Sequence, residues 1–205
     1  MKDWRKLASK ESIQKAIAAL KANGINVFLT NNSQDAREKA LELIPLGAEV
    51  MTMSSVTLDT IGLTKEINES GKYNSVKAKL MKMDRKTQAL EMQKMGAAPE
   101  YAIGSVHAVT EDGKILIASN TGSQLPSYAY GSAHVIWIVG TQKIVKDEEG
   151  GKKRIYEFVL PLESERINKV LGTNSGSFVS KLLIINKEIK PGRLTVILVK
   201  ENLGF

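Results

Sequence analysis

The residues best suited to chemistry lie between 101 and 145, where loops rich in glycine and hydroxyl groups separate apolar runs. Such loops bring backbone amides and hydroxyls against small anionic or polar ligands in α/β proteins. A glycine between two hydroxyl residues, as in Thr121-Gly122-Ser123, lets a ligand approach the backbone closely. We therefore predict an anion-binding site made of Gly104, Ser105, Thr121, Gly122, Ser123, Gly140, Gln142 and Lys143. In this hypothesis the amides of Gly122 and Ser123 hold the anion and Lys143 supplies charge.

Two further polar loops follow apolar runs, Asn31-Asn32-Ser33 and Ser54-Ser55. In an open α/β sheet, ligands bind beyond the carboxyl ends of the strands, where helix N-termini present free amides. Both loops are also ordinary helix caps. We include Ser54 and Ser55 among the predicted ligand-binding residues.

His107 and Glu111 are the candidate catalytic residues. His107 lies two positions beyond Ser105, so a Ser–His–acid arrangement is one interpretation of these residues. The alternatives are a structural histidine and, for Glu111 beside Asp112, turn chemistry. Neither the P-loop nor the dinucleotide-binding glycine pattern is present. The spacing of the histidines predicts no metal site, and no cofactor is indicated.

Composition favours one soluble α/β domain over residues 1–205, with 42% hydrophobic and 25% charged residues. No apolar run reaches the roughly 18–20 residues needed to span a membrane. The absence of cysteine excludes disulfides, a thiol nucleophile and iron–sulfur ligation by this chain. We expect a cytoplasmic location and allow for a homo-oligomer.

The chain is basic, with a net charge of +7. Its densest basic cluster comprises Lys77, Lys79, Lys82, Arg85 and Lys86. Such a cluster is either a solvated helix face or a surface for anions. Aromatic residues make up only 5%, so stacking platforms for nucleic acid are poorly supplied and we expect no nucleic-acid partner.

The first half of the chain alternates between helical and strand patterns. We predict helices around 13–20, from Ser33 to Ile44 and over 56–69, with strands over 25–30 and 48–53. Parallel strands with helical crossovers follow from this order. We predict a further helix over 76–95, either continuous or broken near Asp84, whose methionines indicate either adaptable core or a partner-docking face.

The second half is richer in strands. We predict a hairpin of 101–110 and 114–119 around Asp112-Gly113, and a buried strand over 133–140. Residues 146–154 indicate a flexible excursion and 162–171 a helix. Two last strands are expected over 178–185 and 194–200.

Several segments in order resemble one family, the LUD (lactate utilisation, LutC-like) domain. They are VMTMSSVTLDTIGL from Val50, YNSVKAKLMKMDRKTQALEMQKMGAAPEYAIGSVHAVTEDGKILIASNTGS from Tyr73, and AYGSAHVIWIVGTQKIV from Ala129. The likeness covers most of residues 10–170. The family pattern Gly-Val-Asn-Lys stands here as Gly140-Thr141-Gln142-Lys143, with a side chain one methylene longer at position 142. The tail after about Ser175 departs from the short family members.

The resemblance implies a Rossmann-like fold of the NagB/RpiA/CoA-transferase-like group, with a central, mostly parallel sheet, helices on both faces and an antiparallel hairpin. It also implies a LutC-like role, in which the protein acts with iron–sulfur partners in oxidising L-lactate to pyruvate. Fold alone does not transfer activity. Three hypotheses therefore stand: a binder of a small anionic metabolite, an isomerase- or transferase-type enzyme on a phosphorylated or CoA-linked substrate, and a non-catalytic subunit that docks a partner.

Overall fold

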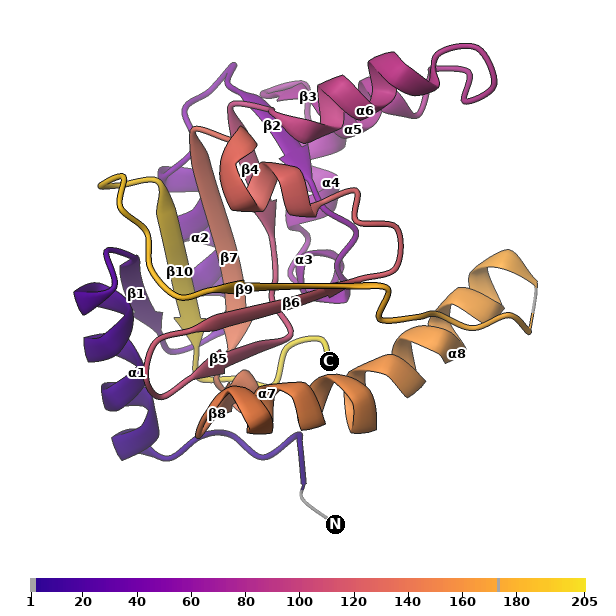
Figure 1. The fold of residues 1–205 in the computed structure, drawn as a ribbon. Helices are drawn as coiled ribbons and strands as arrows, with labels where there is room; N and C mark the ends of the chain where they lie inside the picture. Colours follow the sequence, from indigo (N-terminus) through magenta and orange to yellow (C-terminus); the bar gives the residue numbers. More distant parts are fainter. Residues whose placement is uncertain (1–2, 173) are drawn as a thin grey trace.

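A parallel sheet of six strands lies at the centre of the fold, in the order β1-β10-β7-β4-β2-β3 (Figure 1). The structure is a computed structural model that describes residues 3–172 and 174–205. The strands of this sheet are β1 (Asn26–Thr30), β2 (Glu49–Thr52), β3 (Asn74–Ser75), β4 (Tyr101–Gly104), β7 (His134–Gly140) and β10 (Leu194–Val199). All of their pairings are parallel, as the alternation of helices and strands predicts.

Strand β7 illustrates how both faces of the central sheet are buried. Trp137 packs into one hydrophobic cluster, while Ile136 and Ile138 pack into another, because side chains alternate across a strand. Burial on both faces explains why this strand is an unbroken apolar run in the sequence. One face carries α2 (Ser33–Glu42), α3 (Val56–Thr60) and α4 (Leu63–Glu69), and the other carries α1 (Lys10–Ala22) and a second sheet.

The second sheet has four strands in the order β8-β5-β6-β9. They are β5 (Ala108–Thr110), β6 (Ile115–Ser119), β8 (Ile144–Val145) and β9 (Lys181–Ile185). The predicted hairpin around Asp112-Gly113 is present as the antiparallel pair β5–β6. The prediction of one strand over 101–110 is wrong, because the chain leaves the central sheet after Gly104 and enters the second sheet at Ala108.

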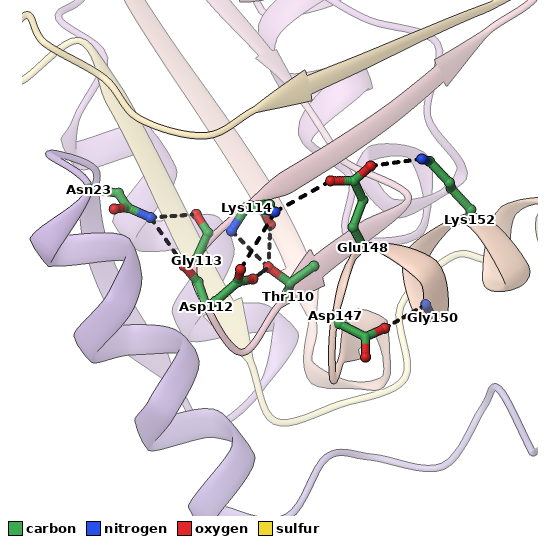
Figure 2. Close-up of polar contacts among 9 residues, drawn as sticks. All are labelled: Asn23, Thr110, Asp112, Gly113, Lys114, Asp147, Glu148, Gly150 and Lys152. Atoms are coloured by element: carbon green, nitrogen blue, oxygen red, sulfur yellow. Dashed lines mark hydrogen bonds and ion pairs between the residues drawn. The ribbon is translucent and has the colours of Figure 1, made fainter.

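The turn of this hairpin is anchored on α1 (Figure 2). The Asn23 amide donates to the backbone carbonyls of Asp112 and Gly113, each at 3.2 Å. Gly113 has φ of +82°, and a Cβ there would lie 2.7 Å from the carbonyl carbon of Ala19. Both the backbone conformation and the close helix therefore require glycine.

Residues 146–154, predicted as a flexible excursion, instead form a helix. Asp147 accepts a hydrogen bond from the Gly150 amide at 2.9 Å and caps α7 (Glu148–Arg154) (Figure 2). The helical path continues through η3 (Ile155–Val159) into α8 (Leu160–Leu171). Ion pairs one turn apart, such as Lys152–Glu148 at 2.7 Å, make this charged sequence compatible with a helix.

The predicted helix over 76–95 is divided into α5 (Val76–Leu80) and α6 (Ala89–Ala97). In Figure 1 the connection between these two helices extends away from the body of the molecule. Met81 is 78% exposed, and no residue of α6 is buried. The core interpretation of the methionines is therefore wrong for Met81, whereas Met83 and Met92 are half-buried and Met95 packs against the main cluster.

Three local features complete the fold. The cap of α2 is Asn32, whose side chain accepts from the Asp35 amide at 2.8 Å, and Ser33 is the first helical residue. The helix predicted over 56–69 breaks at Gly62, which has φ of +73°. The short segment η1 (Ser127–Gly131) is held by the buried Arg193, which donates to backbone carbonyls there.

Across the described residues, no helix is both long and apolar enough to cross a bilayer.

Candidate functional site

A pocket of about 480 Å³ lies at the carboxyl ends of three neighbouring strands, β2, β4 and β7. Because all three strands are parallel, the residues that follow them meet at one edge of the sheet. Ser54 and Ser55 follow β2, Ser105 follows β4, and Lys143 follows β7. The helical path α7–α8 runs past this edge (Figure 1) and closes the pocket from the opposite side.

The pocket has one polar wall and one apolar wall. The polar wall carries short hydroxyl and amide side chains, namely Ser54, Ser55, Thr57, Ser105, Ser119, Asn120, Thr121, Ser123 and Gln124. The apolar wall comes from η3, α8 and the segment before β9, with Ile155, Val159, Leu160, Ile167, Phe178 and Val179. A ligand with a polar head and an apolar body matches this division.

Lys143 is the most unusual group in the pocket. It is the last residue of η2 (Thr141–Lys143), the turn after β7, and it is only 2% exposed. Its Nζ donates to Ser105 Oγ at 3.0 Å and to Thr57 Oγ1 at 3.3 Å. Across residues 3–172 and 174–205, no carboxylate forms an ion pair with it.

Burial and a neighbouring cation act together on this amine. Desolvation and the positive charge of Arg154 lower the pKa of Lys143 from 10.5 to about 7. Arg154 is itself fully buried, and its Nη1 donates to the His107 carbonyl at 2.6 Å. Two cationic side chains thus lie in the interior near the pocket, and no carboxylate in the described part of the chain forms an ion pair with either. Such a cluster favours an anion from outside the chain.

His107 also lines the pocket and is neutral. Its Nδ1 accepts a hydrogen bond from the Ala118 amide at 3.0 Å, so Nε2 carries the proton. Burial, together with the charges of Lys143 and Arg154, lowers the pKa of His107 to about 3. The ring can therefore donate a hydrogen bond to a ligand, but it is a poor base at neutral pH.

The loop after β6 contributes side chains to the pocket, whereas the amides of Gly122 and Ser123 are already occupied. The Gly122 amide donates to Ser119 Oγ at 2.9 Å, and the Ser123 amide donates to Thr121 Oγ1 at 3.3 Å. Gly122 has φ of +88°, which this tight loop requires. The structure thus differs from our hypothesis that these two amides hold the anion, because the hydroxyls of the loop itself accept from them.

Two further basic side chains line the pocket. They are Arg85, from the α5–α6 connection, and Arg166, from α8. Arg166 makes a two-pronged contact with Glu163, with both nitrogen–oxygen distances at 2.7 Å. The carboxylate of Glu163 thus balances the charge of Arg166, in contrast to Lys143.

The predicted site residues divide into two groups. Seven of them line the pocket: Ser54, Ser55, Ser105, His107, Thr121, Ser123 and Lys143. The other five do not: Gly104, Glu111, Gly122, Gly140 and Gln142. The three glycines act by permitting close packing behind the pocket. For example, a Cβ on Gly140 would lie 2.6 Å from the carbonyl oxygen of Glu201.

Glu111 does not reach His107 or the pocket. It lies at the opposite end of β5 from His107, where its Oε1 accepts from Ser12 Oγ at 2.5 Å and its Oε2 lies 3.8 Å from Lys15 Nζ. These contacts tie the hairpin to α1. The sequence spacing of His107 and Glu111 places them on either side of a short strand, so the two do not form a catalytic pair.

Gln142 holds the C-terminal segment in place. Its Nε2 donates to the Leu203 carbonyl at 2.8 Å, which brings Gly204 close to Thr57 and Lys143. A Cβ on Gly204 would lie 3.5 Å from Lys143 Nζ, and Phe205 is among the pocket residues. Gln142 thus acts on the site through the segment that covers Lys143.

Sequence reasoning missed Thr57, Arg154 and the apolar wall. Thr57 stands within the quoted VMTMSSVTLDT motif, so the motif itself held a signal for it. Arg154 and Ile155 were missed because their segment was predicted to be flexible. In the described part of the chain, no three His, Asp or Glu side chains gather as a metal-binding group.

Comparisons with known proteins agree with this architecture. The family model of the LUD domain matches residues 13–199, which extends the likeness through β9 and β10 and corrects the view that the tail departs from the family. A crystal structure of a DUF162 family protein from Deinococcus radiodurans is similar, with a TM-score of 0.56 and 10% identity over 95% of this chain and 99% of that chain. No curated protein matches. The match over most of its length places this chain in the LUD domain family.

Proposed function

We propose that this protein binds a small anionic metabolite in the pocket around Lys143. The observation that carries the proposal is a buried amine that is flanked by Ser105 and Thr57 and has no carboxylate partner among the residues that the structure describes. An anion placed against Nζ would supply the missing charge, and the hydroxyls would bind its oxygens. At the level of the family this is a lactate-utilisation-type protein. A carboxylate such as lactate is one ligand of this class.

Binding should be coupled to proton uptake. An anion beside Lys143 favours the protonated amine and raises its pKa from about 7. Titration calorimetry slightly above neutral pH, repeated in buffers of different ionisation enthalpy, should therefore show uptake of a fraction of a proton. The first panel comprises lactate, pyruvate, sugar phosphates, folates, nucleotides and coenzyme A esters. A ligand at 100 times its dissociation constant stabilises the protein by about 2.7 kcal/mol, which a thermal-shift assay detects.

The matched variants are Lys143→Met and Lys200→Met. Methionine is similar in length to lysine, and Lys200 is an exposed lysine after β10 that contacts Asn31, outside the pocket. We expect Lys143→Met to weaken binding by roughly tenfold or more, as the loss of one charge-assisted contact implies. Lys200→Met should bind as the wild type does. Equal affinities of both variants for every anion would contradict the proposal.

A second function, docking of a partner, is favoured by the exposed arm formed by α5 and α6. Met81 is 78% exposed and Leu90 is 58% exposed, and basic residues accompany them. We propose that this arm contacts an iron–sulfur partner, in keeping with a LutC-like role. Co-purification with co-expressed iron–sulfur partners should depend on both side chains. A complex that survives the double change Met81→Ser, Leu90→Ser would place the contact elsewhere.

A further inference from the structure

Lys143 has the surroundings of a nucleophilic amine as well as those of an ion-pair partner. Only the unprotonated form of lysine carries the lone pair that attacks a carbonyl carbon, and burial without a counter-ion favours that form. With its pKa lowered to about 7, both forms of Lys143 are populated near neutral pH. Lys143 lines the pocket together with Ser105 and Thr57, so the two hydroxyls that contact the amine border the space open to a ligand.

The neighbours of Nζ are suited to the proton transfers that such an attack needs. Ser105 Oγ lies at 3.0 Å and Thr57 Oγ1 at 3.3 Å. A hydroxyl both donates and accepts, so that of Thr57 can pass a proton from nitrogen to the oxygen of an adding carbonyl. The Ser105 hydroxyl donates to the Ile138 carbonyl at 2.7 Å, so its oxygen positions the amine by accepting from it. The neutral His107 ring also lines the pocket and carries its proton on Nε2. It is a further donor within the same space.

The charged groups around Lys143 indicate which kind of carbonyl compound it can bind. A protonated imine keeps a positive charge on the nitrogen, and no carboxylate of the described residues pairs with that position. The charged side chain that acts on it is Arg154, which is also a cation. The balancing negative charge must therefore arrive with the ligand, next to the carbonyl. A carboxylate on the adjacent carbon meets this requirement, and that compound is a 2-oxo acid.

We propose that Lys143 forms a reversible imine with a 2-oxo acid bound in this pocket. The unprotonated Nζ adds to the carbonyl carbon, and a proton passes from nitrogen to oxygen to give a carbinolamine. Protonation of its hydroxyl by solvent and loss of water give the protonated imine, and hydrolysis returns the free amine and the acid. No oxidation or reduction occurs. The inference rests on the proposed anion site and names its ligand class.

Reductive trapping tests the proposal. The full chain is incubated near neutral pH with 2-oxobutyrate and sodium cyanoborohydride, whose hydride reduces the imine carbon to a stable secondary amine. Intact mass should show one adduct per chain, and peptide mapping should locate it on Lys143. Two matched compounds define the chemistry. The hydroxy acid 2-hydroxybutyrate lacks the carbonyl and should give no adduct. Butanone lacks the carboxylate and should react at least about tenfold more slowly.

Calorimetry of the wild type with 2-hydroxybutyrate separates this inference from the anion site, because that compound can bind but cannot form an imine. In Lys143→Arg the guanidinium forms no imine that cyanoborohydride traps, so this variant should lose the adduct. Binding to the wild type without any adduct on Lys143 would overturn the inference and leave the proposed function standing. Absence of binding by 2-oxobutyrate and 2-hydroxybutyrate would overturn the inference, and the proposed function would fall with it only if every other anion of the first panel also failed to bind. The peptide map of the wild type locates the modified lysine even if the variant folds poorly, and modification spread over surface lysines would count against the proposal.

Discussion

Lys143 Nζ lies 3.0 Å from Ser105 Oγ, although the two residues are separated by 38 positions in the chain. They meet because β4 and β7 are neighbouring parallel strands, so the residues after each strand reach the same edge. Ser105 Oγ in turn donates to the Ile138 carbonyl at 2.7 Å. The hydrogen of the serine is thus directed at β7, and its oxygen remains free to accept from the lysine. This pair places the amine at the floor of the pocket.

The first prediction concerns how stability depends on pH. In the folded protein the pKa of Lys143 is about 7, whereas the ordinary value is 10.5. As pH falls between these values, the unfolded chain takes up a proton that the folded chain does not. The free energy of unfolding therefore decreases as the pH is lowered from 10.5 to 7, with a slope approaching about 1.4 kcal/mol per pH unit. Below pH 7 this dependence ends.

Urea unfolding between pH 7 and pH 9.5 measures this effect in the wild type and in Lys143→Met. Methionine has no proton to bind, so the variant should lack this part of the slope and should be more stable than the wild type at pH 7. Lys200→Met serves as the control and should retain the slope. Parallel curves for the wild type and Lys143→Met would mean that Lys143 titrates normally.

The second prediction concerns the hydrogen bond of His107. Its Nδ1 accepts from the Ala118 amide at 3.0 Å, between β5 and β6. Asparagine carries an oxygen that can accept the same hydrogen, whereas leucine leaves the amide without a partner. We expect His107→Leu to lose about 1–3 kcal/mol of stability and His107→Asn to lose about 1 kcal/mol or less. Denaturant unfolding would measure both, and equal losses would contradict the acceptor role.

The third prediction concerns Glu111, which the structure places against α1. In Glu111→Gln the side chain can still accept from Ser12, and only the attraction to Lys15 at 3.8 Å is lost. Because Lys15 is 53% exposed, we expect a change in stability of no more than about 1 kcal/mol. Affinity for anions in the pocket should be unchanged. Weaker ligand binding in calorimetry would return Glu111 to the candidate site.

The fourth prediction concerns the close packing behind the pocket. A Cβ on Gly104 would lie 1.9 Å from the Tyr128 hydroxyl oxygen and 3.2 Å from the Met53 Cβ. Gly104→Ala should therefore destabilise the protein by about 1–3 kcal/mol. Removing the hydroxyl with Tyr128→Phe should relieve part of that cost in the double variant. A coupling free energy near zero in the four-variant cycle would contradict this explanation.

Local sequence patterns predicted the parts of the fold that depend on neighbouring residues. The strand over 133–140 was recognisable because burial on both faces leaves an uninterrupted apolar run. The turn at Asp112-Gly113 was recognisable because an Asp-Gly pair between apolar runs favours a hairpin turn with positive φ. Gly113 adopts such an angle, with φ of +82°. The prediction failed over 146–154, where two glycines and many charges indicated a loop. Ion pairs within α7 and its packing on the second sheet favour a helix there.

The sequence by itself determined the alternation of strands and helices, the family and the polar residues that follow the strands. Only the tertiary structure decided which of these residues meet, because strand order and the change of sheet after Gly104 are long-range properties. It separated Glu111 from His107 and brought Thr57 to Lys143. The burial of Lys143 could not be predicted from the sequence either, since a lysine after a strand is usually exposed. Its side chain is shielded from solvent only because the surrounding elements pack around it.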